Sequence, residues 1–377
     1  MSAIKSKFMF TASLLILLFG CASCLTSETP VIPKTAVPTT VVENAGSFSV
    51  DQNGQIRFFR RTNSSQSLVE DQLFAMKPGE KPVPLLADQS FLPGNIIWAP
   101  DGQAVYFFDT HANKQWVINF PEGDQIREIS QAVFRTWAPT GDRFLAVSTD
   151  LSDQASLVTY DANCNRIGAL DQEMETLQKL FQSLEQNPDM TYLLNYNDID
   201  MRWVKDRLIL ILQVESRSKS WIGRAIVQLD LLNRKASLVS QGHWDLILPS
   251  PSGEYLFFGA GAPASEQSFN GSWLVSKDGQ EWQISEYKAK LRAAWSEDGK
   301  YLYYFEPLWE GSLKSAPDDG DVAFSQLRWQ LIRFDPRTQQ KITLYTDLPL
   351  AGESLVRGDT IYFIDDDNRL LTLPLFP

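Results

Sequence analysis

Four short segments of this chain follow one pattern, a β-type stretch that runs into a tight turn ending in glycine. They cover residues 97–102, 136–141, 248–253 and 294–299, and read Ile-Trp-Ala-Pro-Asp-Gly, Thr-Trp-Ala-Pro-Thr-Gly, Leu-Pro-Ser-Pro-Ser-Gly and Ala-Trp-Ser-Glu-Asp-Gly. An alternating apolar run follows each of them. A strand, a turn and a second strand that recur at intervals of tens of residues indicate a repeat architecture, radial or linear. The pattern constrains the fold closely and says little about activity.

Each repeat can be divided into four short strands, as the unit that begins at Asn95 illustrates. Its predicted strands cover residues 96–98, 104–109, 116–119 and 125–129. The Asp101-Gly102 pair turns the chain between the first two strands, because glycine tolerates the positive φ that a tight hairpin needs. Pro100 ends the inner strand because it has no backbone N–H to donate.

The same layout predicts seven units in all, three of them with a degenerate turn. They span residues 47–86, 95–129, 135–171, 199–240, 245–285, 292–346 and 353–377. The last unit has room for only three strands. A strand at residues 39–43 would supply the fourth and close the ring, since an open ring leaves an exposed edge. We therefore predict an all-β fold, a β-propeller of seven four-stranded blades, with six blades as the alternative.

One segment breaks the rhythm of short strands between the third and fourth units. Residues 172–187 are rich in helix formers and are followed by Pro188. Apolar side chains recur there at steps of three and four residues, which predicts an amphipathic helix within an insertion at residues 173–190. The stripe consists of Met174, Leu177, Phe181 and Leu184. We expect the helix to lie on the propeller; a helix that docks a partner is the alternative.

The repeated Trp-x-Pro-Asp-Gly pattern, followed by an apolar residue and Phe, resembles the TolB-type propeller repeat, which also occurs in propeller domains of the prolyl oligopeptidase group. The resemblance covers most of residues 46–373 and is sharp in the three units that carry the tryptophan. It implies a role with a protein partner at the cell envelope. The propeller fold itself hosts many unrelated activities.

The N-terminus reads as a targeting segment. Lys5 and Lys7 precede an apolar stretch at residues 8–19, which is too short to span a membrane as a helix. The stretch ends in Leu-Phe-Gly before Cys21, and this resembles a bacterial lipoprotein signal with Cys21 as the lipidated residue. The alternative is an ordinary secretory signal cut near residues 22–23.

These features predict three parts: a signal peptide at residues 1–20, a Pro/Thr-rich tether at 21–45 that contains the expected closing strand, and the propeller at 46–377. We expect the chain to be exported and held at the cell membrane or outer membrane through its lipid, facing the periplasm or the exterior. A disulfide between Cys24 and Cys164 is compatible with export, but a free Cys164 in a turn is the favoured reading.

Residues with catalytic or metal-binding chemistry are sparse. The two histidines, His111 and His243, have no Gly-x-Ser-x-Gly nucleophile motif beside them and do not stand at metal-ligand spacing. Acidic runs at 318–321 and 365–368 lack the spacing of a calcium loop and read as solvated turns. The formal charge of -12 argues against nucleic-acid binding. We therefore predict no catalytic residue, no metal and no cofactor.

The expected function is a protein-binding or scaffolding module at the cell envelope. Its recognition surface would include the long connection at 306–326 and the helical insertion. A glycan- or peptide-binding protein, or a hydrolase that uses the central pocket, is the alternative, and a purely structural component is a third possibility. Aromatic residues near blade connections are candidate stacking surfaces: Trp221, Trp244, Phe269 and Trp309.

Overall fold

The computed structural model describes most of the chain from Lys34 onward, within one compact unit that spans Pro33–Pro377. The described residues are 34–35, 37–62, 70–86, 89–122, 125–148, 156–186, 190–193, 199–216, 222–242, 244–260, 271–287, 291–308, 328–349 and 351–375. Residues 1–33, which include the expected signal peptide and Cys21, lie outside them.

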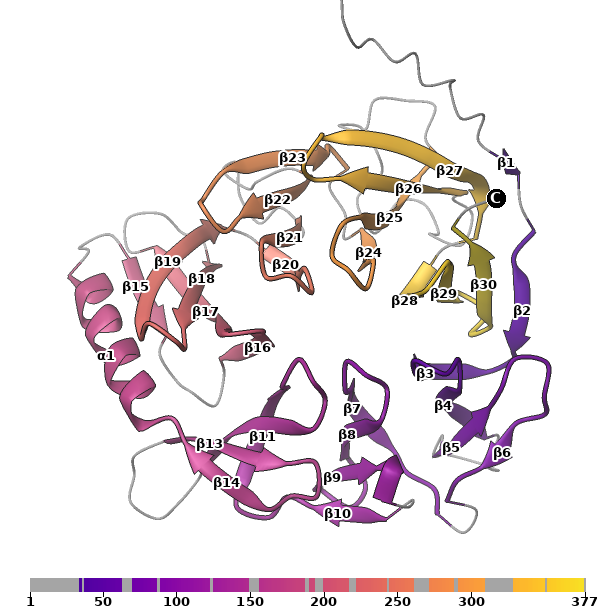
Figure 1. Cartoon of the computed structure of the whole chain (residues 1–377), viewed down its shortest axis with the longest axis horizontal. Helices are drawn as coiled ribbons and strands as arrows, with labels where there is room; N and C mark the ends of the chain where they lie inside the picture. Colours follow the sequence, from indigo (N-terminus) through magenta and orange to yellow (C-terminus); the bar gives the residue numbers. More distant parts are fainter. Residues whose placement is uncertain are drawn as a thin grey trace, which may run out of the picture. The chain divides into compact units, whose positions relative to one another are not determined.

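Seven antiparallel sheets form a ring of blades around a central axis, so the alternative of six blades is excluded (Figure 1). Blades 1 to 3 consist of β3 (Ala45–Val50), β4 (Ile56–Thr62), β5 (Glu70–Met76) and β6 (Val83–Pro84); β7 (Pro93–Trp98), β8 (Ala104–Asp109), β9 (Lys114–Asn119) and β10 (Ile126–Glu128); and β11 (Ala132–Trp137), β12 (Arg143–Ser148), β13 (Ser156–Asp161) and β14 (Arg166–Ala169). A short 3-10 helix, η1 (Phe120–Glu122), follows β9.

Blades 4 to 7 repeat this layout. They consist of β16 (Asp200–Val204), β17 (Arg207–Ser216), β18 (Ile222–Asp230) and β19 (Lys235–Gly242); β20 (Trp244–Pro249), β21 (Tyr255–Ala260), β22 (Ser272–Ser276) and β23 (Glu281–Ser285); β24 (Arg292–Trp295), β25 (Leu302–Pro307), β26 (Trp329–Asp335) and β27 (Gln340–Leu348); and β28 (Ala351–Arg357), β29 (Thr360–Asp365) and β30 (Leu370–Pro374). In every blade the first strand in this order is the innermost one (Figure 1).

An N-terminal strand completes the last blade. β2 (Thr39–Val42) pairs antiparallel with β30 and so becomes the outer strand of blade 7, as the closing-strand prediction requires. The chain then enters β3, the innermost strand of blade 1. The sequence does not predict β1 (Lys34–Thr35), which pairs in parallel with β27 on blade 6. The segment expected to be a tether therefore contributes two strands.

The repeated motif builds the same turn in four blades, and blade 1 has a closely similar one. In blade 2 the Ala99 N–H donates to the Ala104 carbonyl and the Gly102 N–H donates to the Ala99 carbonyl, both at 2.9 Å. The equivalent two bonds start at Ala138, Ser250 and Ser296, and in blade 1 the Asp51 N–H donates to the Gln55 carbonyl, so that turn is one residue shorter. The turn glycine has a positive φ in each case, 72° at Gly102 for example, a conformation that costs little only for glycine. Blades 4 and 7 instead use a two-residue turn.

The turn glycines also lie close to the preceding blade. A Cβ placed on Gly102 would stand 2.9 Å from Ser49 Oγ and 3.2 Å from the backbone nitrogen of Asp51, both in blade 1. A Cβ on Gly299 would meet Ser252 of blade 5 at 3.1–3.3 Å. Where the preceding blade has the two-residue turn, the contact is looser. A Cβ on Gly253 would stand 3.3 Å from Val204, and a Cβ on Gly54 would have nothing within 4 Å. Glycine is thus needed both for φ and for close packing between blades.

The predicted helix is present as α1 (Asp171–Glu185), and it lies against the ring (Figure 1). Met174, Leu177 and Phe181 are buried with apolar side chains of blades 3 and 4, and Leu184 packs at the edge of this cluster. After α1 the chain forms β15 (Met190–Leu193), which pairs with the C-terminal part of β17, whereas β16 pairs with its N-terminal part. The whole predicted stripe is therefore used in packing on the propeller.

Candidate functional site

The larger of the two cavities described here lies at one mouth of the ring, where the innermost strands of blades 2 to 7 end in their turns. It has a volume of about 460 Å³. This size falls within the range of small-molecule and peptide-side-chain pockets. Motif residues form much of its wall: Trp98, Pro100, Trp137, Pro139, Pro251 and Trp295, with Trp203 added by blade 4. We call it the mouth cavity.

The tryptophans of the motif are held by hydrogen bonds that cross between blades. The indole N–H of Trp98 donates to Ser47 Oγ at 3.0 Å, that of Trp137 to the Ile97 carbonyl at 2.9 Å, and that of Trp295 to the Leu248 carbonyl at 3.1 Å. Each acceptor lies on the innermost strand of the preceding blade. Because the N–H of each indole has a hydrogen-bond acceptor inside the protein, the apolar faces of the indole rings are left to form the cavity wall.

Arg357 fixes the charged side of the mouth cavity. Its Nε donates to the Val50 carbonyl at 2.6 Å, one Nη donates to the Pro100 carbonyl, and the other lies 2.9 Å from Glu297 Oε1. This single side chain joins blade 7 to blades 1, 2 and 6. Glu297, the one carboxylate among the residues that line the mouth cavity, is therefore already neutralised.

A second carboxyl group lies next to this wall. Glu353 lies within a register shift in β28 and directly precedes Ser354, which lines the mouth cavity. The side chain is exposed to solvent, yet protein atoms surround it closely enough to displace much of its hydration. This desolvation raises the pKa of Glu353 to about 7, against hydrogen bonds from Ser47 and the Phe48 backbone that favour the charged form.

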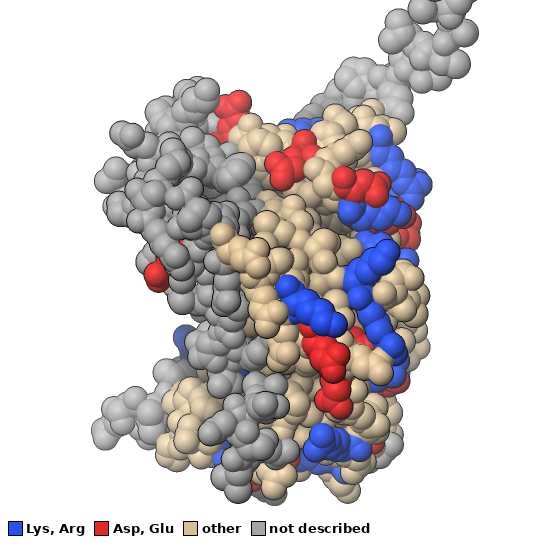
Figure 2. Space-filling view, turned by 90° about the vertical axis from the view of Figure 1, so that its left-hand side faces the viewer, with Lys and Arg blue, Asp and Glu red and all other residues tan. Residues whose placement is uncertain are grey.

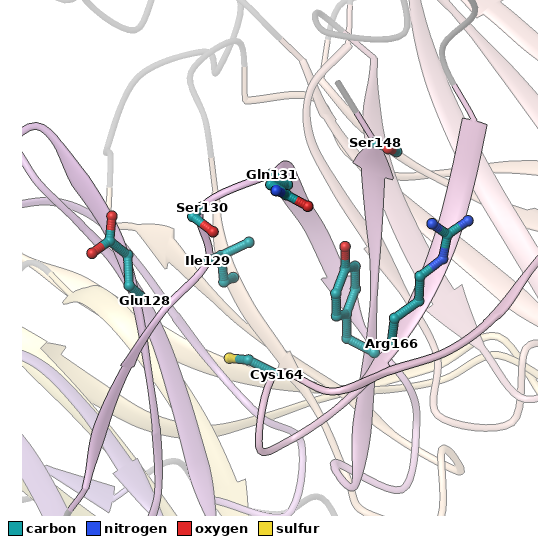
Figure 3. A pocket seen from close by; sticks show the side chains of 8 residues that line it. Glu128, Ile129, Ser130, Gln131, Ser148, Cys164 and Arg166 are labelled. Carbon is teal, nitrogen blue, oxygen red and sulfur yellow. The ribbon is translucent and has the colours of Figure 1, made fainter. Parts of the chain in front are cut away.

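A smaller polar pocket of about 210 Å³ lies between blades 2 and 3 (Figure 3). Glu128 and Arg166 stand on opposite sides of it, with the Cys164 thiol between them. Burial raises the pKa of Cys164 to about 12, so the thiol stays protonated and is a poor nucleophile. Glu128 forms an ion pair with Lys114 at 2.7 Å. The pocket therefore brings together polar side chains without an activated reactive group.

The predicted candidate residues are placed as follows. Cys164 is a free cysteine in the turn after β13, as expected, whereas Cys21 and Cys24 lie outside the described residues. His111 lies in the turn after β8, where its backbone N–H donates to Asp109 Oδ1. His243, Trp221, Phe269, Trp309 and the run at 318–321 fall outside the described residues, and Trp244 begins β20.

The second acidic run does bring carboxylates together. Ligand oxygens of Asp365, Asp366 and Asp367 lie within 4.8 Å of one another. The Arg369 guanidinium stands 2.6 Å from Asp365 and 3.0 Å from Asp367, and backbone N–H groups of the turn also donate to Asp365. The protein's own cation and turn thus account for this cluster.

Of the two elements expected to form the recognition surface, neither α1 nor the described residues 306–308 of the long connection lines either cavity. The outward face of α1 is polar, and acidic and basic side chains are interspersed on the side of the ring that carries it (Figure 2). Residues 309–327 of the long connection lie outside the described residues. The mouth cavity is instead built from the repeat itself, whose pattern indicates strands and turns and says little about activity. Tryptophans near the end of four of the seven inner strands were the signal, since a ring directs equivalent positions to one axis.

No helix within the described residues is long and apolar enough to cross a membrane. No protein-family model matches the sequence, and no curated protein matches it.

Solved structures show the same fold at low sequence identity. The β-propeller domain of the trilobed protease from Pyrococcus furiosus is 10% identical, with a TM-score of 0.53 over 91% of this chain and 99% of that one. Hydrazine synthase from Kuenenia stuttgartiensis is 12% identical, with a TM-score of 0.51 over 91% and 98%. A protein from Agrobacterium tumefaciens described as putative TolB is 11% identical, with a TM-score of 0.40 over 79% and 94%, a similarity that is too low to carry an argument. At such identities the likeness concerns the fold alone: the chain is a seven-bladed β-propeller.

Proposed function

We propose that this propeller is the binding module of an exported, lipid-anchored protein, and that its mouth cavity takes an extended segment of a protein partner. The observation that carries the proposal is the aromatic wall at the end of the ring, about 460 Å³ in volume and lined by four tryptophans. Aromatic-lined grooves suit extended peptides, because rigid rings offer large contact areas with little loss of conformational entropy.

The charges at the mouth cavity favour binding over hydrolysis. A glycosidase of the common type needs two carboxyl groups on either side of the scissile bond. Glu297 is the single carboxylate among the lining residues, and Arg357 holds it in an ion pair. Glycan binding without hydrolysis remains the second candidate, because the half-buried faces of Trp98 and Trp203 would also stack on sugar rings.

A selection experiment with the full-length chain tests the site and separates the two candidates. Ala293 lines the mouth cavity, so Ala293→Trp fills it, while Ile167→Trp introduces the same side chain on the exposed outer strand β14. We expect the native chain and Ile167→Trp to enrich the same sequences from a library of displayed random peptides, and Ala293→Trp to lose them. Trp203→Ala is a second cavity variant that removes bulk instead.

Two outcomes contradict the proposal: enrichment that is unchanged in both cavity variants, or no enrichment by the native chain. If the native chain binds a glycan array and Ala293→Trp abolishes that binding, the glycan candidate replaces the peptide.

The anchor is tested separately. The residues before Cys21 match the pattern of a lipoprotein signal, and we propose that Cys21 carries the lipid that holds the propeller at the cell envelope. Metabolic labelling with a palmitate analogue should mark the native chain in the membrane fraction and leave Cys21→Ala unlabelled. Label that persists in Cys21→Ala refutes the assignment, and Cys24→Ala serves as the matched control.

A further inference from the structure

Glu353 differs from the other acid at the mouth. It stands on the innermost strand of blade 7, in the register shift between Ala351 and Ser354, and its side chain is exposed although the strand is internal to the ring. Glu297 has Arg357 as a counter-ion at 2.9 Å. Within the described part of the chain, Glu353 has no ion pair.

The partners of Glu353 are uncharged hydrogen-bond donors. Ser47 and the backbone N–H of Phe48, both on β3, donate to its carboxyl group. β3 itself carries no charged residue. The other two strands that pack on β28 carry Arg292, on β24, which has an interaction of its own, and Asp365, on β29, which is paired with Arg369. Nothing described around Glu353 neutralises a carboxylate.

A hydrogen-bond chain connects Glu353 to the aromatic wall. Ser47 Oγ donates to Glu353 and accepts the indole N–H of Trp98 at 3.0 Å. Trp98 lines the mouth cavity, as does Ser354 next to Glu353. Glu353 itself does not line the mouth cavity, but it is adjacent in sequence to Ser354, which does, and Ser47 links its carboxyl group to the indole of Trp98.

We infer that Glu353 binds the cationic group of the occupant, so that the mouth cavity selects an apolar segment that carries a primary ammonium, such as a lysine side chain. This inference rests on the proposed function for the nature of the occupant. The site supplies what such a group needs: an acid without a counter-ion, and tryptophan faces that attract a cation.

Proton balance follows from the environment of the free site. With a pKa near 7, the Glu353 carboxyl is partly protonated at neutral pH. An ammonium group favours the carboxylate, so binding releases this proton to the solvent. The affinity for a cation should therefore increase as the pH rises through the pKa of Glu353.

The experiment uses a matched pair of small probes, hexylammonium and hexan-1-ol, which share an apolar chain and differ in charge. Binding to the full-length chain is followed by tryptophan fluorescence. At about pH 8 we expect the native chain to prefer hexylammonium by about tenfold, and this preference to fall several-fold at about pH 5. Glu353→Gln should remove the preference and its pH dependence. Glu128→Gln, an acid at the smaller pocket, should leave both unchanged.

A preference for hexylammonium that survives in Glu353→Gln overturns the inference, as does equal binding of both probes to the native chain. The probes do not depend on the peptide selection, so the two proposals fail separately. If the selection yields no peptide while the ammonium preference stands, the cation site is kept and the protein partner is rejected. If cavity-dependent peptides appear without an ammonium preference, the partner is kept and the role of Glu353 is rejected.

Discussion

The glycine at position 102 offers a direct test of how neighbouring blades are packed. Gly102→Ala adds one methyl group that would stand 2.9 Å from Ser49 Oγ and 3.2 Å from the backbone of Asp51 in the preceding blade. Gly54→Ala is the matched control. Its φ of 76° is close to the 72° of Gly102, but nothing lies within 4 Å of the added methyl group.

The comparison separates two costs. Both substitutions place a side chain in the left-handed region, which costs about 1 kcal/mol for each. Only Gly102→Ala also forces a backbone shift between two packed blades, and overpacking of this kind costs about 1–3 kcal/mol. We therefore expect the free energy of unfolding to fall by about 1 kcal/mol in Gly54→Ala and by about 2–4 kcal/mol in Gly102→Ala.

Urea unfolding of both variants, followed by far-ultraviolet circular dichroism and by tryptophan fluorescence, measures the difference. Coincident transitions from the two signals would show that the ring unfolds as one unit. If Gly102→Ala loses no more stability than Gly54→Ala, glycine is required at this turn for its φ alone, and the close packing of successive turns has no energetic role.

Three further tests probe other parts of the fold. Leu177→Ala removes a fully buried side chain of α1 and should lower the free energy of unfolding by about 2–5 kcal/mol, whereas Gln178→Ala on the exposed face should change it by less than about 0.5 kcal/mol; similar values would contradict the packing of α1 on blades 3 and 4. Trp137→Phe removes the hydrogen bond that the indole donates to the preceding blade, and should lower the free energy of unfolding, measured in urea, by about 2 kcal/mol. Trp203→Phe removes an indole hydrogen bond within its own blade and should lower the free energy of unfolding by about half as much. The pKa of Glu353 is raised from 4.5 to about 7, so the folded state binds the proton of this group more tightly than the unfolded state does. The stability that the group contributes is therefore lost as the pH rises from the lower to the higher of these two pKa values. Glu353→Gln should thus be more stable than the native chain by about 1–2 kcal/mol at about pH 8, a figure reduced for solvent screening, and nearly equal to it at about pH 4; a constant difference across pH would refute the raised pKa.

Local patterns made the blade architecture predictable. A Pro-Asp-Gly turn and the alternation around it involve residues near one another in sequence, and the stripe on α1 has the period of a helix that packs on one side. Even the closing strand could be expected, because the seventh unit lacked a fourth strand. The short β1 had no such signal, since two residues carry no periodicity and their partner lies on blade 6.

The candidate site was harder to predict, because it depends on contacts between distant parts of the chain. Glu353 owes its raised pKa and its hydrogen bonds to Ser47 and Phe48, which lie near the opposite end of the chain. No local pattern marks such a carboxyl group among the 46 acidic residues. The tryptophans of the motif were visible in the sequence, but their shared role at the mouth cavity emerges only when the ring brings them together.

The pairing of β2 with β30 has a consequence for how the chain acquires its fold. A chain that emerges from the ribosome N-terminus first exposes β2 early, and its partner appears only with the last residues. Closing so long a loop is slow, because much chain entropy is lost before the contact forms. Until then β2 presents unpaired edges, which are prone to intermolecular pairing. Any factor that shields strand edges during synthesis would therefore find its longest-lived target in β2.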